Sequence, residues 1–352
     1  MLKKRMLHID IAKSIAIIWI VYGHALVQMQ GTQFYSSYLD KQMGFMFTLF
    51  SFRLPLLFMI SGAFQRRRLE YSFASHKEYL VKIFQTILLP FYSLSLIFLL
   101  INVTMSKYLN SPSMSEMIYS LLLQQSNNNI LPSGVMWFLF TLFNCAFLTY
   151  FAIRVFKLRP IYFLLFALVL KAVSGVFTNA YFLALDTTSQ FLFFFVLGYY
   201  FDKYVIYEPI HKWKYLAWFI VAYLFLLVTY FNLSAFPPAF VAVFKFIKSF
   251  EIFGILVTLI IFGIAHKLAE KYSESKVLRW FIYCGASSML IYVFHMPTFT
   301  LLNLIMNIVH VYPGVVKLLL LFVPGVIFPL IYGKILSYNK AAYKLLIGRD
   351  PG

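Results

Sequence analysis

The chain has 352 residues, of which 62% are hydrophobic and only 12% are charged. A soluble domain is usually about 45–50% apolar and about 25% charged, so this excess of apolar surface has to face lipid. The formal net charge of +18 does not indicate nucleic-acid binding, because the basic residues lie between apolar runs, as topology determinants do. Residues 1–352 contain no soluble stretch long enough for a second domain, so we expect a single polytopic membrane domain.

Ten apolar segments have the length of about 20 residues that a membrane-spanning helix requires. In chain order they are 9–29, 45–64, 80–103, 135–153, 160–177, 188–203, 214–231, 247–265, 280–302 and 314–335. These segments do not alternate between apolar and polar residues as the strands of a membrane barrel do. The sequence therefore predicts an all-α integral membrane protein, a bundle of about ten transmembrane helices.

The positions of lysine and arginine predict the orientation of these helices. If the amino terminus is inside, the outer segments hold five basic residues: Lys41, Lys107, Lys245, Lys248 and Lys317. Nearly all the others of the 30 lie in the cytoplasmic segments. Because cytoplasmic loops are enriched in lysine and arginine, we expect both termini to be cytoplasmic.

The two cysteines, Cys145 and Cys284, lie in apolar segments. We expect them to be buried core residues without a disulfide. Together with the compact loops, this indicates a multi-pass protein of a bacterial plasma membrane.

Charge inside a bilayer costs about 2.5–3.5 kcal/mol on insertion scales, so ionisable groups at membrane depth indicate function. The candidates are Lys13, His24, Arg53, Glu251 and His295. Asp10 and Lys171 lie near helix ends, where a long side chain can snorkel and a carboxylate can stay hydrated.

Three of these side chains, Asp10, Lys13 and His24, share one face of the first predicted helix. Lys13 and His24 are eleven residues apart, which is three turns and roughly 16 Å, and Asp10 is three residues before Lys13, within pairing distance. His24 and His295 each follow the cytoplasmic start of an outward-running helix by about 15 residues, or roughly 22 Å. Because Arg53 also reaches the middle of its segment, we expect these groups to line one cavity.

Each candidate also has a structural interpretation. A membrane histidine can pack with its ring bonded to a neighbouring carbonyl, Arg53 can pair with Glu251 or a helix-end carbonyl, and Glu251 can simply be hydrated. The triple Arg66-Arg67-Arg68 is either a topology anchor or a docking patch for phosphates. No residue cluster has metal-ligand spacing, so no metal site is expected, and the common nucleotide-binding, zinc-protease and serine-hydrolase motifs are absent.

Several short segments resemble motifs of one known family. Lys13 and His24 match one motif, in which a basic residue is followed by ten residues and then by a histidine. Residues 52–62 read FRLPLLFMISG. Residues 77–92 contain a basic pair, Lys77 and Lys82, and end in the sequence Pro-Phe-Tyr. Residues 193–199 read FFFVLGY, and residues 288–295 read SMLIYVFH. In this order they resemble the acyltransferase-3 family of membrane O-acyltransferases, and among its members the standalone sugar O-acetyltransferases such as fucose 4-O-acetylase. Many relatives have histidine where this chain has Arg53, which weakens transfer of an acid–base role to this position.

The resemblance implies transfer of an acyl group, by analogy acetyl, from cytoplasmic acyl-CoA to a hydroxyl of a cell-surface glycan or its lipid-linked precursor. Acyl-CoA is then a co-substrate and not a tightly bound cofactor. The expected base is His24, with His295 orienting it or carrying the acyl group, and Arg53 stabilising the oxyanion or holding the acceptor. The expected ligands of the CoA phosphates are Lys13, Arg66, Arg67, Arg68, Lys77 and Lys82.

A transporter or flippase of a glycan or acylated intermediate is the alternative. Buried charges and the helix-interrupting Pro55, Pro90, Pro324 and Pro329 would serve transport equally well. An inverted repeat would favour transport, and the sequence contains none that we recognise.

Overall fold

The computed structural model describes residues 6–29, 51–71, 75–104, 135–177, 182–202, 213–249, 251–311 and 314–351, with the isolated positions 113, 115 and 118. Within these residues the chain is helical and contains no strand, which agrees with the predicted all-α class. It divides into two compact units. Unit 1 comprises residues 1–63 and 201–327, and unit 2 comprises residues 64–200 and 328–352.

Unit 1 is built around helix α1 (Leu7–Val27), which packs against α14 (Ile252–Tyr272), α15 (Lys276–Ala286) and α16 (Ser288–Ile308). The other helices of unit 1 are the start of α4 (Arg53–Tyr71), α12 (Trp213–Phe231), η5 (Leu233–Ala235), α13 (Pro238–Ser249) and the start of α17 (Val315–Ser337). Small side chains on α1, including Ala12, Ala16 and Ala25, are fully buried. They permit the close helix approach on which membrane packing depends.

Gly285 of α15 marks the closest approach to α1, because a Cβ added there would overlap the backbone carbonyl of Asp10. In the stripe on α1, Asp10 is buried, and Lys13 and His24 are partly buried.

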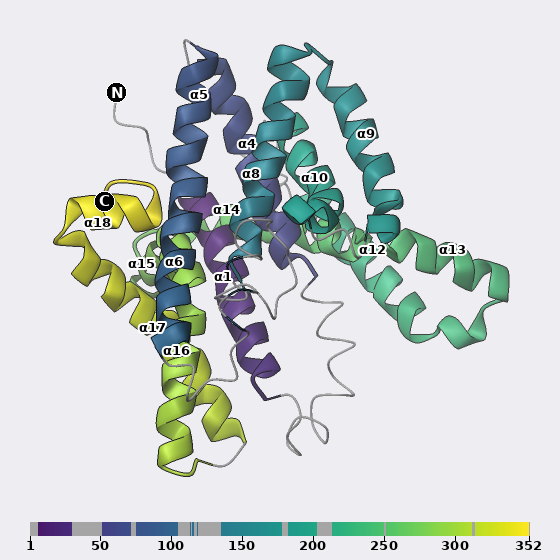
Figure 1. Ribbon diagram of the computed structural model, residues 1–352. Coiled ribbons are helices and arrows are strands. Elements are labelled where there is room, and N and C mark those ends of the chain that lie inside the picture. The colour runs from purple at the N-terminus through teal and green to yellow at the C-terminus, as the bar shows by residue number, and fades with distance from the viewer. Residues whose placement is uncertain are drawn as a thin grey trace. The chain divides into compact units, whose positions relative to one another are not determined.

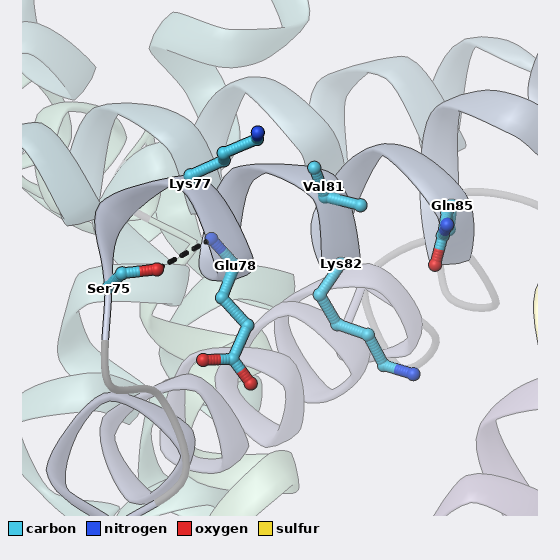
Figure 2. Close-up of a pocket in the computed structure, with 6 residues that line it drawn as sticks. All are labelled: Ser75, Lys77, Glu78, Val81, Lys82 and Gln85. Carbon is cyan, nitrogen blue, oxygen red and sulfur yellow. Dashed lines mark hydrogen bonds between the residues drawn. The ribbon is translucent and has the colours of Figure 1, made fainter.

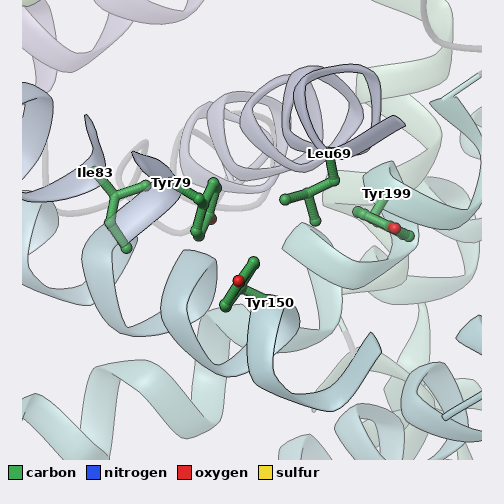
Figure 3. Packing of buried hydrophobic residues seen from close by; sticks show 5 residues of the cluster. All are labelled: Leu69, Tyr79, Ile83, Tyr150 and Tyr199. Atoms are coloured by element: carbon green, nitrogen blue, oxygen red, sulfur yellow. The ribbon is translucent and has the colours of Figure 1, made fainter. Parts of the chain in front are cut away.

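Unit 2 contains one long rod, His76–Thr104, formed by α5 (His76–Ile83), η1 (Phe84–Leu88) and α6 (Leu89–Thr104) (Figure 1). The other elements of unit 2 are α8 (Trp137–Tyr150), η2 (Phe151–Val155), α9 (Pro160–Ala172), η3 (Ser174–Phe177), η4 (Phe182–Ala184), α10 (Leu185–Tyr200) and α18 (Lys340–Ile347), with the ends of α4 and α17. A buried cluster of Leu69, Tyr79, Ile83, Tyr150 and Tyr199 joins four of these helices (Figure 3). The rings of Tyr79 and Tyr150 stack with their centroids 4.2 Å apart.

Seven helical runs in the described residues are long and apolar enough to cross a membrane. They are Leu7–Val27, His76–Ile101, Trp137–Val155, Phe182–Tyr200, Ile252–Tyr272, Ser288–Ile308 and Val315–Ser337, and each overlaps one of the ten predicted segments. Segments 160–177 and 214–231 correspond to the shorter apolar helices α9 and α12. Segment 45–64 corresponds to α4, although residues 45–50 lie outside the described part of the chain. A total of ten spans therefore stays a prediction.

The predicted segment 280–302 is not one helix. It is divided between α15 and α16 at Ser287, whose φ of −98° and ψ of 13° are not helical. The apolar pattern does not register this division, because apolar residues continue on both sides of Ser287. Helix α15 ends directly after the close contact of Gly285 with α1. His295 is therefore the eighth residue of α16, and counting from residue 280 overestimated its distance from the start of its helix.

The side chain of Lys171 also differs from the expectation that it snorkels at a helix end. It is buried, its ammonium group donates to the carbonyl of Gln190 at 3.2 Å, and it lies 4.7 Å from the ring centroid of Phe194. A backbone carbonyl of α10 and an aromatic face thus surround this charge in place of water. Cys145 and Cys284 are both buried and free.

Candidate functional site

Two of the predicted site residues, His24 of α1 and His295 of α16, meet in unit 1. Nδ1 of His24 lies 3.4 Å from Nε2 of His295, and the rings are T-shaped with centroids 5.1 Å apart. They are 271 residues apart in sequence. Their contact follows from the packing of α16 against α1.

The hydrogen bonds around His295 assign the tautomer of both rings. Nδ1–H of His295 donates to the carbonyls of Tyr292 at 2.7 Å and Ile291 at 3.1 Å. In a neutral imidazole the other nitrogen carries the lone pair, so Nε2 of His295 accepts and Nδ1–H of His24 donates to it. This assignment leaves Nε2 of His24 as the atom able to accept a proton.

The two histidines also differ in accessibility. His295 is fully buried, at 0% exposure, and the ring of Phe299 packs edge-on against it with centroids 5.7 Å apart. His24 is only partly buried. Because a buried ring with both nitrogens engaged offers no atom to a thioester, this geometry favours the predicted orienting role of His295 over that of an acyl carrier.

Arg53 begins the described part of α4 and reaches across to the middle of α1. Its Nη1 donates to the carbonyl of Trp19 at 3.2 Å, and its charge lies close enough to His24 to interact electrostatically. A Cβ added at Gly23 would overlap the Arg53 guanidinium, so this glycine makes room for it. The structure thus brings a fixed positive charge to the histidine pair.

Lys13 lies on α1, as His24 does, but it is not part of the contact between His24 and His295. Its ammonium group bonds to the carboxylate of Asp10 at 3.3 Å, which is the predicted pairing. Because α1 is one continuous helix, Lys13 lies roughly 16 Å from His24 along the axis, too far for direct contact with its ring.

Gln28 and Asn303 form a second polar pair between α1 and α16, one that sequence reasoning missed. Nδ2 of Asn303 donates to Oε1 of Gln28 at 3.1 Å. Gln28 follows His24 by four residues and Asn303 follows His295 by eight, so helical spacing from the two histidines is the signal that could have found them. Searching the spans only for ionisable groups left these amides out.

The other predicted phosphate ligands belong to unit 2, where one of the arginines has a structural contact. Nη1 of Arg66 donates to the carbonyl of Tyr200, the last residue of α10, at 3.2 Å. Arg154 makes the same kind of bond to the carbonyl of Leu69 in the last turn of α4. These bonds satisfy helix-end carbonyls, which gives Arg66 a structural contact within unit 2. Arg68 is exposed and Arg67 is half-buried.

Lys77 and Lys82 line an open depression of about 460 Å³ along α5, with Ser75, Glu78, Val81 and Gln85 (Figure 2). The hydroxyl of Ser75 caps the helix by accepting from the backbone N–H of Glu78 at 3.2 Å. Both lysine side chains are exposed. Among the described residues no group of three His, Cys, Asp or Glu side chains is placed to hold a metal ion.

Comparison with known proteins gives one match. The profile of a family described as an acyltransferase domain matches residues 6–334, which includes every candidate residue discussed above. No curated protein and no solved structure gives a significant match.

Proposed function

Because the chain belongs to the acyltransferase-3 family, we propose that it is a membrane O-acyltransferase using cytoplasmic acyl-CoA, with acetyl as the acyl group. The acceptor is a hydroxyl of a cell-surface glycan or of its lipid-linked precursor. The observation that carries this proposal is the His24–His295 pair, in which a buried imidazole orients an accessible one.

The proposed reaction uses Nε2 of His24 as a general base. It takes the proton of the acceptor hydroxyl while the oxygen attacks the thioester carbonyl, forming a C–O bond. The C–S bond then breaks, and the His24 imidazolium returns its proton to the CoA thiolate, so the products are an ester and CoA-SH. Arg53 stabilises the negative charge that develops on the carbonyl oxygen, because a guanidinium only donates hydrogen bonds.

The position of Lys13 supports entry of the donor from the cytoplasm. The roughly 16 Å between Lys13 and His24 along α1 is comparable to the length of an extended phosphopantetheine arm, so a thioester at His24 would place a CoA phosphate near Lys13. We assign the same role to Arg66, Arg67, Arg68, Lys77 and Lys82, of which Lys77, Lys82 and Arg68 have exposed side chains. Acyl-CoA, the glycan and membrane lipid are thus the proposed partners.

The proposed topology has ten spans with both termini in the cytoplasm of a bacterial plasma membrane. It rests on the distribution of basic residues between the apolar segments, described above. Lys13 lies toward the cytoplasmic end of α1 in this orientation, and His24 lies toward the outer end.

Radiolabelled acetyl-CoA turnover in inside-out vesicles tests the proposal. The vesicles are loaded with a glycan pool extracted from the host, and the wild type is compared with His24→Ala and with His310→Asn. His310 is an exposed histidine at the end of α16, which makes it a matched control. We expect base-labile label on the glycan with the wild type and the control, and loss of this label with His24→Ala.

Equal transfer by the wild type and His24→Ala would contradict the assignment of the base. Absence of transfer in vesicles that still move the glycan across the membrane would make transport the leading account. Buried charge alone does not distinguish these functions, whereas transfer of the acyl group does.

A further inference from the structure

The polar pair formed by Gln28 and Asn303 lies along the same two helices as the histidine pair. On α16, His295, Phe299 and Asn303 follow one another at intervals of four residues, and Phe299 packs against the ring of His295. On α1, Gln28 lies one turn beyond His24, which is about 6 Å along the axis. The face that carries the histidine pair therefore continues to a pair of neutral amides, on the opposite side of His24 from Lys13.

The hydrogen bonding of this pair is incomplete. The Nδ2–Oε1 bond uses one donor and one acceptor, and Oδ1 of Asn303 is buried without a hydrogen-bond partner among the described residues. A buried polar atom left unsatisfied destabilises the fold. Whichever way the two amide groups are assigned, one bond between them leaves a carbonyl oxygen on one residue and an NH₂ group on the other.

A pair whose only task was to join two membrane helices would not need this orphan acceptor. Interhelical hydrogen bonds of that kind contribute on average less free energy than an unsatisfied buried oxygen costs. The arrangement instead leaves one acceptor and one donor open for a third group, and the half-buried Gln28 gives access to them.

We propose that Gln28 and Asn303 form a hydroxyl-binding subsite for the acceptor sugar, an assignment that rests on the proposed function. A sugar hydroxyl both donates and accepts, so it can insert between the amides, donating to Oδ1 of Asn303 and accepting from the NH₂ group of Gln28. Neither amide is charged, so the subsite suits a neutral polyol better than a carboxylate or a phosphate. Donor and acceptor then approach His24 from opposite ends of α1.

The spacing makes this subsite a determinant of specificity. The turn of about 6 Å between His24 and Gln28 corresponds to about the width of one pyranose ring. One hydroxyl held at Gln28 and Asn303 therefore directs another hydroxyl of the same or the adjoining sugar toward Nε2 of His24. An acceptor lacking the bound hydroxyl would leave the amides unpaired, which is how polar sites reject such analogues.

The test combines binding, transfer and stability in the full-length protein. The probe is a tritium-labelled glycan pool from the host, and its equilibrium binding is measured for the wild type, Asn303→Leu, Gln28→Leu and the double variant. Asn307→Leu is the matched control, since Asn307 is exposed one turn further along α16. Thermal unfolding in detergent and acetyl-CoA hydrolysis without acceptor are measured on the same preparations.

We expect the single and double variants to bind the glycan pool about 10–100-fold more weakly, as loss of one or two buried hydrogen bonds implies. The control Asn307→Leu should bind the glycan pool normally and should hydrolyse acetyl-CoA at the wild-type rate. The double variant should be at least as thermally stable as the wild type, because replacing both partners of an incompletely bonded pair by apolar groups removes the orphan.

Unchanged glycan binding in the variants would overturn the proposal. So would a double variant that unfolds at a lower temperature and loses binding and acetyl-CoA hydrolysis together, since the pair would then serve helix packing. If the wild type transfers no acetyl group but the variants still lose glycan binding, the proposed function fails while the subsite stands.

Discussion

Substitution of His295 tests most directly whether the histidine pair is a catalytic device. His295→Phe keeps an aromatic ring, a somewhat larger one, but the Nδ1–H group of His24 loses its acceptor and the tautomer of His24 is no longer assigned. Groups that orient a functional imidazole typically contribute about 10–100-fold. The His24–His295 contact is long for a hydrogen bond, at 3.4 Å. We therefore expect kcat to fall by about 10–100-fold, or about 1.4–2.8 kcal/mol.

The assay is the vesicle turnover of radiolabelled acetyl-CoA, with kcat and KM determined at equal amounts of folded protein. KM for acetyl-CoA should change little, because His295 is fully buried and has no exposed surface for the donor to contact. His295→Gln supplies the second measurement, since its side-chain oxygen can accept from Nδ1–H of His24 and should restore part of kcat. His24→Ala sets the background rate.

Two results would refute this reasoning. A wild-type kcat in His295→Phe would show that His24 needs no orienting partner. A background rate in His295→Gln, in protein as stable as the wild type, would instead indicate that His295 itself reacts, as an acyl carrier would.

Three further substitutions test other parts of unit 1. Gly23→Ala displaces the flexible end of Arg53, so kcat should fall about tenfold, a loss of about 1.4 kcal/mol of transition-state stabilisation, with little change in thermal stability. An unchanged kcat would remove Arg53 from the mechanism. Lys13→Met should raise KM for acetyl-CoA about tenfold while kcat stays within about twofold, reflecting one charge-assisted bond to a phosphate, and an unchanged KM would exclude this contact. Gly285→Ala forces α15 away from the backbone of α1 and should lower the free energy of unfolding in detergent by about 1–3 kcal/mol. The control Gly314→Ala, with open space around it, should leave stability unchanged, and equal stability of the two variants would contradict the close packing.

The sequence alone predicts the helical class, because apolar runs are a local pattern. It also indicates the family, because the short motifs follow one another in a fixed order along the chain. Runs of about 20 apolar residues define spanning helices without reference to neighbours, since lipid cannot satisfy backbone groups. The cost of burying charge singled out Lys13, His24, Arg53 and His295, and helical spacing placed Asp10 beside Lys13. Apolar length, buried charge and helical spacing are each properties of one segment.

Tertiary packing decided everything that joins segments. The break at Ser287 and the close contact of Gly285 with α1 are features that no apolar pattern contains. The burial of Lys171 depends on a carbonyl and an aromatic ring from α10.

The roles that we propose for the two histidines also rest on packing, because residues 271 positions apart acquire unequal exposure and an assigned tautomer only when their helices meet. The same holds for Gln28 and Asn303. Single amides in a span carry no charge that would single them out in the sequence. Their hydrogen bond and the unsatisfied Oδ1 of Asn303 are defined only where α1 and α16 lie together.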